Sequence, residues 1–477
     1  MSATALQLFN SLSRRKERFA PLEAGHARVY SCGPTVYSAQ HIGNMRANVF
    51  ADLLKRALLG EGLRVTHVIN ITDVGHLTDD ADAGEDKMEA AARTSGRSAQ
   101  EIAAQFTAQW QRDRRRLNCL EPEVLCKASE HIAEQIAMVR ALEARGVTYR
   151  IADGVYFDVT KFPRYAELAR LDLAAQHGAS RIADVPGKRN PADFALWKFA
   201  GEGVKRQQEW DSPWGRGFPG WHIECSAMST KYLGATFDIH TGGVEHLGVH
   251  HTNELAQSEV ALGVHPWVNV WMHQDWLVFD GEKLAKSRGN AYVLDDVVAL
   301  GGTPLGFRFF LLQAHYRKQQ NVSDDGLLAA DRGYRRMLAS TAAARAATGA
   351  ADAARIAPWR ARFRDAVRDD LNAPRALAET IELLRAPELT PADQRALLEE
   401  CDAWLGLDLL TAELGADADA GESDPRIDAL VAEREAARKR RDFAASDRIR
   451  DQLAAEGVTI VDSPQGPRWK RGARGNS

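Results

Sequence analysis

Four residues from three separate parts of the sequence have side chains of the types that can bind a soft divalent metal. They are Cys32, Cys225, His250 and Glu254, and the last two are four positions apart. That spacing puts both side chains on one face of a helix. Two sulfurs, one nitrogen and one oxygen form a tetrahedral donor set that suits zinc. The sequence therefore indicates a zinc site, provided that the fold brings these segments together.

The same residues also have a structural interpretation, which the sequence leaves open. The chain contains no Cys-X-X-Cys pair. A free cysteine is often buried as a small hydrophobic side chain, so Cys32 and Cys225 could be core thiols and His250 an ordinary helix histidine. His222 and His251 remain competing nitrogen ligands.

A phosphate-binding pattern follows Cys32. Residues 32–37 read Cys-Gly-Pro-Thr-Val-Tyr and lead to His-Ile-Gly-Asn at 41–44, where a predicted helix begins and runs to Leu59. A helix N-terminus offers unpaired N–H groups and partial positive charge to a phosphate, and Gly43 allows close approach. His41 would stabilise charge that develops on a reacting phosphate. In isolation, a structural turn explains this motif better.

A second basic motif lies much later, where residues 283–290 read Lys-Leu-Ala-Lys-Ser-Arg-Gly-Asn. Two ammonium groups on a loop, those of Lys283 and Lys286, suit the charge of a triphosphate as it approaches a transition state. In isolation, a solvated charge run is the simpler explanation. Together, and in this order along the chain, the two motifs indicate ATP chemistry.

The elements that would position these residues form a β-α-β unit, with strands at 28–30 and 64–71 around the predicted helix. Such units build parallel sheets, which bind ligands at the carboxyl ends of their strands. Cys32, His41 and Thr72 fall at those ends. A strand, helix and strand at 237–240, 250–262 and 267–271 suggest that the sheet resumes. The irregular stretch between the two parts would be an insertion that splits one nucleotide-binding domain.

Downstream of about Asp331 the composition shifts to Ala and Arg with helical periodicity, which predicts an all-helical domain. The run at 342–354 is a loop or a weak helix. A linker rich in Gly, Ala, Asp and Glu at 415–424 leads to a final pair of helices and a β-like segment, Val458–Val461. Two amphipathic helices are also predicted between Ser98 and Arg145.

Bulk properties describe a large multidomain protein. The chain has 477 residues, 45% of them hydrophobic, and a net charge of −4. No apolar run approaches the roughly 18 residues that span a bilayer, and five scattered cysteines fit reduced thiols or metal ligands. We therefore expect a cytoplasmic protein without a membrane partner. A nucleic-acid partner would have to bind local basic clusters, such as those at 112–116 and 438–441.

The two basic motifs resemble the HIGH and KMSKS sequences of the class I aminoacyl-tRNA synthetases. Asn44 replaces the last histidine of the first motif, and Leu284 and Ala285 replace Met and Ser of the second. The resemblance implies ATP binding, with Mg²⁺, by residues of both motifs: His41, Gly43, Asn44, Lys283, Lys286 and Ser287. Of these, His41, Lys283 and Lys286 would be catalytic.

The metal pattern narrows the resemblance to the cysteinyl-tRNA synthetases, in which one zinc ion per chain is held by the residues that correspond to Cys32, Cys225, His250 and Glu254. The similarity extends over nearly the whole chain, through segments at 70–73, 188–191, 193–198, 370–374, 441–450 and 464–466. It implies that Gly33, Thr72 and Trp221 lie near the substrate cysteine. Val74–His76, Thr241–Val249 and Thr252 depart from the family pattern.

The resemblance also implies a domain organisation. We expect the α/β catalytic domain to be Rossmann-like and to be followed by an anticodon-binding helical bundle and a small C-terminal domain. The expected boundaries are 1–125 and 211–300 for the two catalytic halves, 126–210 for the insertion, 301–330 for a stem-contact segment, 331–414 for the helical domain, 415–424 for the linker and 425–477 for a tRNA-binding C-terminal domain.

The implied reaction joins cysteine to tRNA(Cys). The cysteine carboxylate would attack the α-phosphate of ATP, and a terminal ribose hydroxyl would then take the cysteinyl group from the adenylate. A pocket alone separates near-isosteric amino acids by only about 1 to 3 kcal/mol, whereas zinc binds a thiolate much better than the serine hydroxyl. We expect a monomer.

Two other functions remain open. The first is a cysteine ligase of mycothiol biosynthesis, which uses the same first half-reaction and an aminosugar acceptor. The helical domain and the basic C-terminal helices favour tRNA instead. The second is a noncatalytic zinc- and RNA-binding paralogue, which the basic residues of both ATP motifs disfavour.

Overall fold

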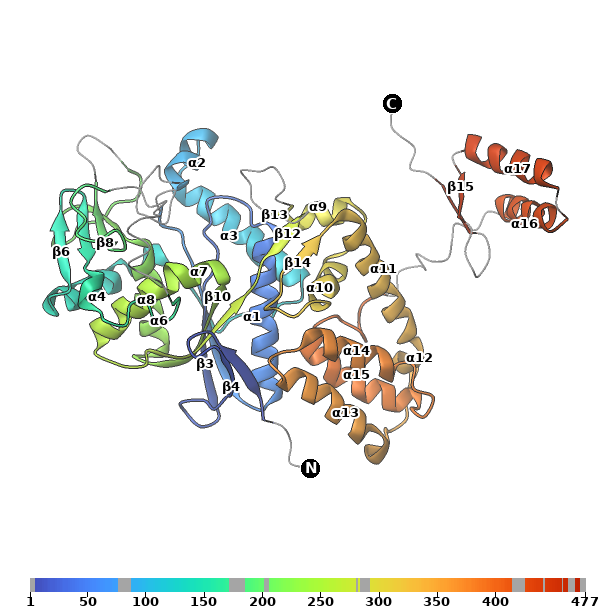
Figure 1. The fold of residues 1–477 in the computed structure, drawn as a ribbon, viewed down its shortest axis with the longest axis horizontal. Coiled ribbons are helices and arrows are strands. Elements are labelled where there is room, and N and C mark those ends of the chain that lie inside the picture. The colour runs from blue at the N-terminus through green and yellow to red at the C-terminus, as the bar shows by residue number, and fades with distance from the viewer. Residues whose placement is uncertain are drawn as a thin grey trace. The chain divides into compact units, whose positions relative to one another are not determined.

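The computed structural model of the protein describes residues 5–75, 87–170, 185–200, 206–279, 282–283, 292–413, 425–440, 442–456, 458–461 and 468–471. The chain divides into two compact units, Met1–Leu410 and Thr411–Ser477 (Figure 1). Within the described residues, none of the helices combines the length and apolarity that crossing a bilayer requires.

A five-stranded parallel sheet forms the centre of the first unit, as the sequence predicts. Its spatial order is β11-β10-β3-β4-β5, and every neighbouring pair is parallel. The strands are β3 (His26–Ser31), β4 (Arg64–Ile71), β5 (Val124–Lys127), β10 (Phe237–Gly243) and β11 (Val268–Gln274). The predicted α/β fold is therefore confirmed.

The sheet winds in two directions from β3. Helix α1 (Ile42–Gly60) connects β3 to β4 on one side, and α8 (His250–Leu262) connects β10 to β11 on the other. Because parallel crossovers are right-handed, helices that lead in opposite directions cover opposite faces of the sheet. The strand order thus reverses between β3 and β10, and sheets of this kind bind ligands at the carboxyl ends of the strands that flank such a point.

Both faces of the sheet are covered, which explains the nearly continuous burial along β4. On one face, Tyr30, Val68 and Cys126 join a core with Ile223 and Met228 of α6 (Trp221–Leu233). Helix α6 packs against α8 and against α4 (Ile132–Ala144). On the other face, α1 contacts β4.

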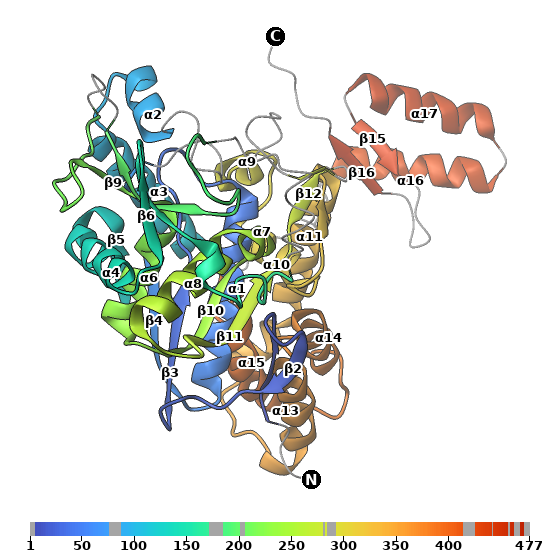
Figure 2. The ribbon, with the colours of Figure 1, turned by 60° about the vertical axis from the view of Figure 1, so that its left-hand side comes forward.

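A four-stranded antiparallel sheet, β6-β7-β8-β9, lies between the two parts of the parallel sheet in sequence. Its strands are β6 (Thr148–Ile151), β7 (Gly154–Phe157), β8 (Phe194–Phe199) and β9 (Gly217–Pro219). Strand β9 leads directly into α6, so this sheet determines where α6 begins (Figure 2). The remaining early elements are β1 (Gln7–Asn10), β2 (Arg15–Arg18), α2 (Lys87–Ser95), α3 (Ala99–Arg116), and the 3₁₀ turns η1 (Ala128–His131) and η2 (Val159–Lys161).

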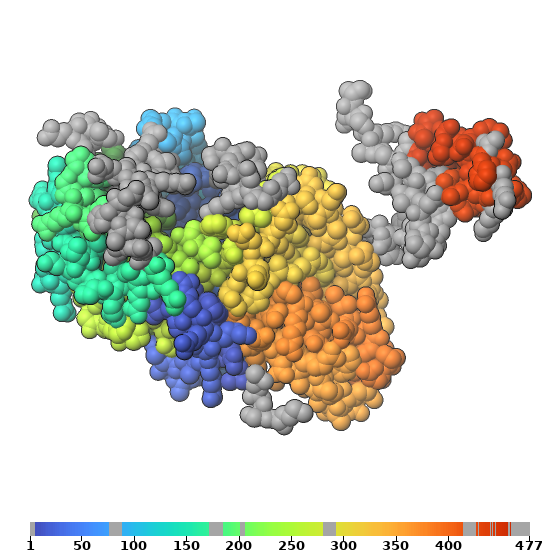
Figure 3. Space-filling model, in the orientation of Figure 1, coloured from blue at the N-terminus to red at the C-terminus, as the bar shows by residue number. Residues whose placement is uncertain are grey.

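A small mixed sheet follows β11, with the order β13-β12-β14. Its strands are β12 (Leu277–Phe279), β13 (Glu282–Lys283) and β14 (Gln320–Val322). The remainder of the first unit is helical, and Figure 3 shows its orange part in contact with the yellow α10–α11 segment. Its helices are α9 (Leu294–Ala299), α10 (Pro304–Leu312), α11 (Asp324–Ser340), α12 (Ala342–Ala346), α13 (Ala353–Arg368), α14 (Ala373–Leu383) and α15 (Pro391–Leu405).

The second unit has a core of its own. It contains α16 (Pro425–Lys439), α17 (Phe443–Ala455) and an antiparallel pair of strands, β15 (Val458–Val461) and β16 (Arg468–Arg471). The buried apolar side chains that pack together there include those of Ile427, Val431, Ile449, Leu453 and Val458.

Candidate metal and nucleotide site

The four predicted metal ligands come together at the point where the strand order reverses. Cys32 follows β3, Cys225 lies in the first part of α6, and His250 and Glu254 lie one turn apart in α8. One donor atom from each residue lies within 4.8 Å of every other. Cys225 Sγ is 3.6 Å from His250 Nε2, and that nitrogen is 3.0 Å from Glu254 Oε1. We call these residues the first donor group.

The chemistry of the first donor group fits a metal ion. Cys225, His250 and Glu254 are buried, and Cys32 is half-buried. Glu254 Oε1 has no well-aligned hydrogen bond within the described part of the chain, although a histidine nitrogen lies near it. Two sulfurs, a nitrogen and an oxygen that converge in this way form a donor set of the kind that holds zinc.

Groups around the first donor group orient two of its members. His222 Nδ1 lies 2.9 Å from His250 Nδ1, which leaves Nε2 of His250 facing the donors. His240 Nε2 lies 3.0 Å from Glu254 Oε2. Such partners hold ligand side chains in a fixed orientation and raise their basicity. His222, one of the competing ligands, thus lies behind His250.

The other competing ligand, His251, belongs to a second donor group with Cys32, His240 and Glu254, whose donor atoms also lie within 4.8 Å of one another. His251 Nε2 is 3.3 Å from Cys32 Sγ, and its Nδ1 is 2.7 Å from His273 Nε2. The two groups share Cys32 and Glu254. A single ion would therefore be completed either by Cys225 and His250 or by His240 and His251.

The buried charges of the first donor group are strongly coupled. Burial alone would lower the pKa of His250, but Glu254 and Cys225 raise it to about 10. Burial alone would raise the pKa of Glu254, but His240 and His250 hold it at about 2. The hydrogen bond from Cys32 lowers the pKa of Cys225, while burial raises that of Cys32 well above its ordinary value. A charged His250–Glu254 pair therefore lies beside two thiols whose pKa values are shifted in opposite directions.

The predicted nucleotide motif begins α1. His41 is its N-cap residue, and His41 Nδ1 accepts a hydrogen bond of 3.3 Å from the backbone N–H of Asn44. The Asn44 side chain returns a bond, because its Oδ1 accepts from the His41 N–H at 3.1 Å. Since Nδ1 is an acceptor, the neutral His41 ring carries its proton on Nε2. Asn44, a departure from the family motif, thus completes the cap of the helix that would face phosphate.

The second nucleotide motif is described only in part. Lys283 lies in β13, where its backbone pairs with Val278 of β12. Lys286 and Ser287 lie outside the described residues. Gly43 is the second residue of α1.

Two of the predicted substrate residues, Trp221 and Thr72, have defined contacts in the structure. The Trp221 ring centroid is 4.5 Å from that of His250, so this side chain forms a wall beside the first donor group. Thr72 follows β4, and its hydroxyl accepts a hydrogen bond of 3.0 Å from the Asn70 amide. Gly33 has a steric role as well, because a Cβ there would lie 1.6 Å from the Asn70 carbonyl oxygen.

Sequence reasoning did not find three further histidines around this site. His240 lies in the middle of the buried strand β10, His273 lies near the end of β11, and His246 lies in α7 (Val244–Gly248), which follows β10. Burial lowers the pKa of His246 to about 4. His273 and His246 lie at or just after the carboxyl ends of β11 and β10, and that position is the signal that could have revealed these two.

Comparison with known proteins gives consistent matches. The family model of the tRNA synthetase class I (C) catalytic domain matches residues 18–332, and that of the cysteinyl-tRNA ligase anticodon binding domain matches 420–469. The chain is 47% identical to cysteine–tRNA ligase 1 of Burkholderia lata over 97% of its own length and 96% of that protein. It is 45% identical to the cysteine–tRNA ligase of Novosphingobium aromaticivorans, with coverages of 98% and 97%.

Solved structures match in fold. A LeuRS–tRNA–LeuAMS complex from Agrobacterium radiobacter has a TM-score of 0.61 at 11% identity, covering 83% of this chain and 86% of that one. Mycobacterium tuberculosis methionyl-tRNA synthetase in complex with methionyl-adenylate has a TM-score of 0.50 at 14% identity, with coverages of 81% and 90%.

Proposed function

We propose that this chain, which belongs to the cysteine–tRNA ligase family of class I tRNA synthetases, selects cysteine through a bound zinc ion before it charges tRNA(Cys). As a member of that family it is an ATP-dependent aminoacyl-tRNA ligase. One observation carries the metal part of the proposal: four donor atoms from three separate segments lie within 4.8 Å of one another in the interior.

Cys32, Cys225, His250 and Glu254 would hold the zinc ion. When bound, zinc would accept a substrate thiolate as an additional ligand far better than a hydroxyl. The protein fixes the ligands in advance, because His222 contacts the second nitrogen of His250 and His240 contacts the second oxygen of Glu254.

The walls of the pocket orient the rest of the amino acid. Trp221 covers one side beside His250. Gly33 and Thr72 stand at adjacent strand ends, and the absence of a side chain at Gly33 lets the two segments approach closely. In this position they would leave the substrate carboxylate directed toward the start of α1.

Adenylate formation then requires positioning and charge stabilisation more than covalent chemistry. The cysteine carboxylate attacks the α-phosphate of Mg²⁺-bound ATP, and pyrophosphate leaves. The N-terminus of α1 favours negative charge. The Nε2–H group of His41 can donate a hydrogen bond to a phosphate oxygen. Asn44 holds the cap in shape, and Lys283, Lys286 and Ser287 would contact the triphosphate.

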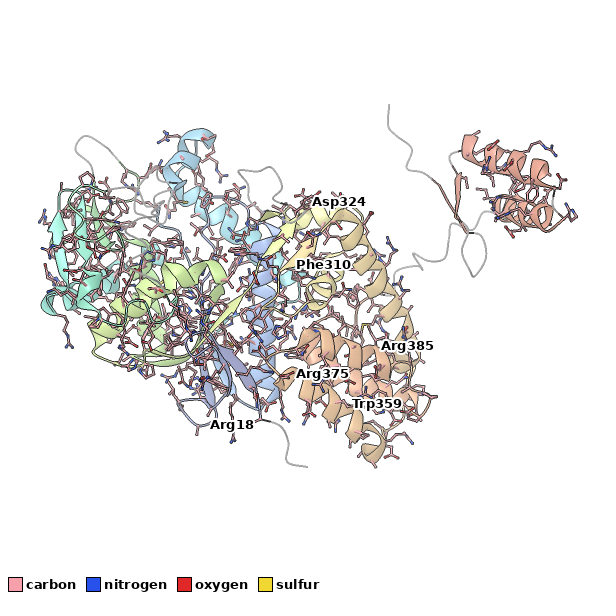
Figure 4. All side chains as sticks on the ribbon, in the orientation of Figure 1. Arg18, Phe310, Asp324, Trp359, Arg375 and Arg385 are labelled. Atoms are coloured by element: carbon pink, nitrogen blue, oxygen red, sulfur yellow. The ribbon has the colours of Figure 1, made fainter. Side chains whose placement is uncertain are left out.

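The second half-reaction uses tRNA. The terminal ribose hydroxyl attacks the adenylate carbonyl, and AMP leaves. The helical part of the first unit presents exposed arginines, including Arg375 and Arg385 (Figure 4), and the second unit matches an anticodon-binding family. These surfaces would bind the distal arm through phosphate contacts, with base contacts for identity. We further propose a cytoplasmic monomer.

The test measures cysteine-dependent ATP–pyrophosphate exchange, metal content and acceptor choice in one preparation. We expect one zinc per chain, exchange with cysteine but not serine, and transfer to tRNA. Glu254→Gln should lose zinc and most of the exchange activity, whereas the control Glu399→Gln, at an exposed ion pair on α15, should lose neither.

Each alternative has its own outcome in the same test. Transfer of cysteine to an aminosugar in place of tRNA would identify the mycothiol-pathway ligase. Absence of exchange from the zinc-loaded wild type would identify a noncatalytic paralogue. Full selectivity for cysteine in protein that carries no metal would overturn the role of zinc.

A further inference from the structure

Arg46 is a buried cation whose hydrogen bonds go to backbone carbonyls. It lies in the second turn of α1 and is 4% exposed. Its Nη1 donates to Trp276 O at 2.6 Å, and its Nη2 donates to Lys318 O at 2.6 Å. Longer contacts reach His315 O at 3.3 Å and Tyr316 O at 3.5 Å. One side chain of α1 therefore gathers two separate backbone segments.

The two strongest contacts lie at the entrances of two paired strands. Trp276 immediately precedes β12, and Lys318 lies two residues before β14. Strands β12 and β14 are parallel neighbours, so the guanidinium holds both at the same end. Gln320 of β14 also donates to Phe310 O of α10 at 2.6 Å, and Phe310 is labelled in Figure 4.

Strand β12 has a second neighbour, which carries a residue of the ATP motif. Val278 pairs with Lys283 of β13. In Figure 1 this small sheet lies beside α1, and the two are in contact. Anything that fixes β12 against α1 therefore fixes the backbone of Lys283 against the same helix.

The other end of this connection is the start of α1. Arg46 lies little more than one helical turn after the N-cap residue His41. The helix backbone therefore fixes the distance between these two residues. The first N–H of the helix, that of Ile42, donates to Tyr292 O at 2.8 Å. Tyr292 is in turn bonded through its hydroxyl to Asp324 at 3.0 Å. The chain on both sides of the lysine motif is thus attached to the first two turns of α1.

We propose that Arg46 is a positioning residue for adenylate formation, which sets the strand that bears Lys283 at the correct distance from the His41 end of α1. The inference rests on the proposed function. It adds a residue that does not touch the substrates and acts through the relative placement of the two ATP motifs.

The chemistry of arginine suits this role. A planar guanidinium offers five N–H donors in a fixed fork and can bond to several carbonyls at once, whereas lysine offers a compact charge. Burial lowers the pKa of Arg46 to about 10, against an opposing effect of Asp275, so the side chain stays charged at neutral pH. A side chain that merely filled space here would not need a charge that is costly to bury.

The experiment compares two buried arginines of the same helix. Arg56 also lies in α1 and donates to the backbone, to Ala403 O at 2.8 Å and Asn118 O at 2.6 Å. It also pairs with Asp52 Oδ2 of the same helix at 2.8 Å, and none of its three partners belongs to either ATP motif. Arg56→Gln and Arg56→Lys are therefore matched controls for Arg46→Gln and Arg46→Lys.

Steady-state exchange, cysteine affinity, zinc content and melting temperature are measured for each variant. Arg46→Gln should lower kcat/KM for ATP by about 100-fold, the size of effect that a misplacement of about 1 Å produces. Its zinc content and its affinity for cysteine should not change. The hydrogen bonds of Arg46 go to Trp276, His315, Tyr316 and Lys318, and none of them reaches a residue of the first donor group. Arg46→Lys should be intermediate. The Arg56 variants should lose thermal stability but retain the kinetic constants for ATP.

Two results would overturn the inference. One is an Arg46→Gln enzyme whose ATP constants match those of Arg56→Gln. The other is a parallel loss of ATP and cysteine binding, which would mean a general folding defect. If Arg46→Gln does not fold, the same comparison is made with Arg46→Lys. The proposed function is tested separately by the wild type, whose lack of cysteine-dependent exchange would overturn that proposal irrespective of the variants.

Discussion

His240 and Glu254 form a fully buried pair in which Nε2 lies 3.0 Å from Oε2. The other oxygen of Glu254 points toward His250. One carboxylate thus connects a strand of the parallel sheet to the helix that carries two predicted ligands. The contribution of His240, the strand residue of this pair, was not predicted from the sequence.

His240→Asn should weaken metal binding by about 10- to 100-fold without abolishing it, because the residue orients a ligand of the first donor group. Competition with a zinc chelator measures the affinity. The control is His131→Asn, since His131 is also buried and bonded but contacts Lys127 O and Tyr232 instead. Complete loss of metal from His240→Asn would indicate that His240 is itself a ligand, as in the second donor group.

The two donor groups can be separated with residues that belong to only one of them. Cys225→Ser removes a ligand of the first group, and His251→Asn removes a ligand of the second. We expect the first change to abolish stoichiometric zinc and the second to retain it. Cobalt substitution provides the measurement, because the number of thiolate ligands determines the intensity of the sulfur-to-cobalt absorption. Cys401→Ser, at a buried thiol outside both groups, should match the wild type.

The cap of α1 allows the structural and chemical roles of His41 to be separated. His41→Asn keeps a good N-cap residue but removes the ring and its Nε2 proton. The melting temperature should therefore change little, while the rate of exchange falls by about 100-fold, as for the loss of one donor to a transition state. Ser98→Ala at the equivalent cap of α3 should show the reverse. A large drop in melting temperature for His41→Asn would contradict this separation.

Gly33 should tolerate no side chain. Gly33→Ala would place a Cβ 1.6 Å from the Asn70 carbonyl oxygen, so the ends of β3 and β4 must move apart. We expect a lower unfolding midpoint and a lower affinity for cysteine, measured by denaturation and by calorimetry. Gly60→Ala at the end of α1 provides the control, because a Cβ there meets no atom within 4 Å among the described residues. Normal cysteine binding by Gly33→Ala would remove Gly33 from the proposed pocket.

Acid should weaken the helical part of the first unit through Asp393. The hydrogen bond from Arg355, together with bonds from Thr390 and the Asp352 N–H, holds the pKa of the Asp393 carboxyl well below its usual range. A depressed folded-state pKa contributes stability above the unfolded pKa of about 3.9, and that stability is lost as the pH falls further.

Asp393→Asn should therefore lower the urea midpoint at pH 7, and the difference from wild type should shrink below pH 4. Glu399→Gln, whose pair with Arg395 is exposed, should change neither midpoint. A difference that stayed constant with pH would mean that the carboxylate charge is not what stabilises this helix start.

The sequence predicts much of the site because its strongest patterns are local. The predicted strand 64–71 and the predicted helix 250–262 coincide with β4 and α8. The i, i+4 spacing of His250 and Glu254 then places both side chains on one helix face. The gathering of Cys32 and Cys225 with them has no local signature, and only the resemblance to a family anticipated it.

Other elements were missed for physical reasons. Strand β5 (Val124–Lys127) lies between the two predicted amphipathic helices of the 98–145 segment, and four residues are too few to show a period. Strand β16 (Arg468–Arg471) contains three basic residues and no apolar alternation, so only its pairing with β15 defines it as a strand. The burial of Arg46 could not be inferred either. A buried guanidinium is stable only where hydrogen-bond acceptors replace water, and the carbonyls that do so come from segments distant in sequence.

The position of β3 in the middle of the parallel sheet has a consequence for how the protein is made. Strand β3 bonds to β10, which the ribosome synthesises some two hundred residues later, so one edge of β3 stays exposed until then. Unpaired strand edges are prone to non-native association. The insertion sheet and α6 must also emerge before this edge is covered. The first donor group, which includes residues of α8, is therefore complete only late in synthesis, and we expect chaperone demand to be greatest during the interval between the two strands.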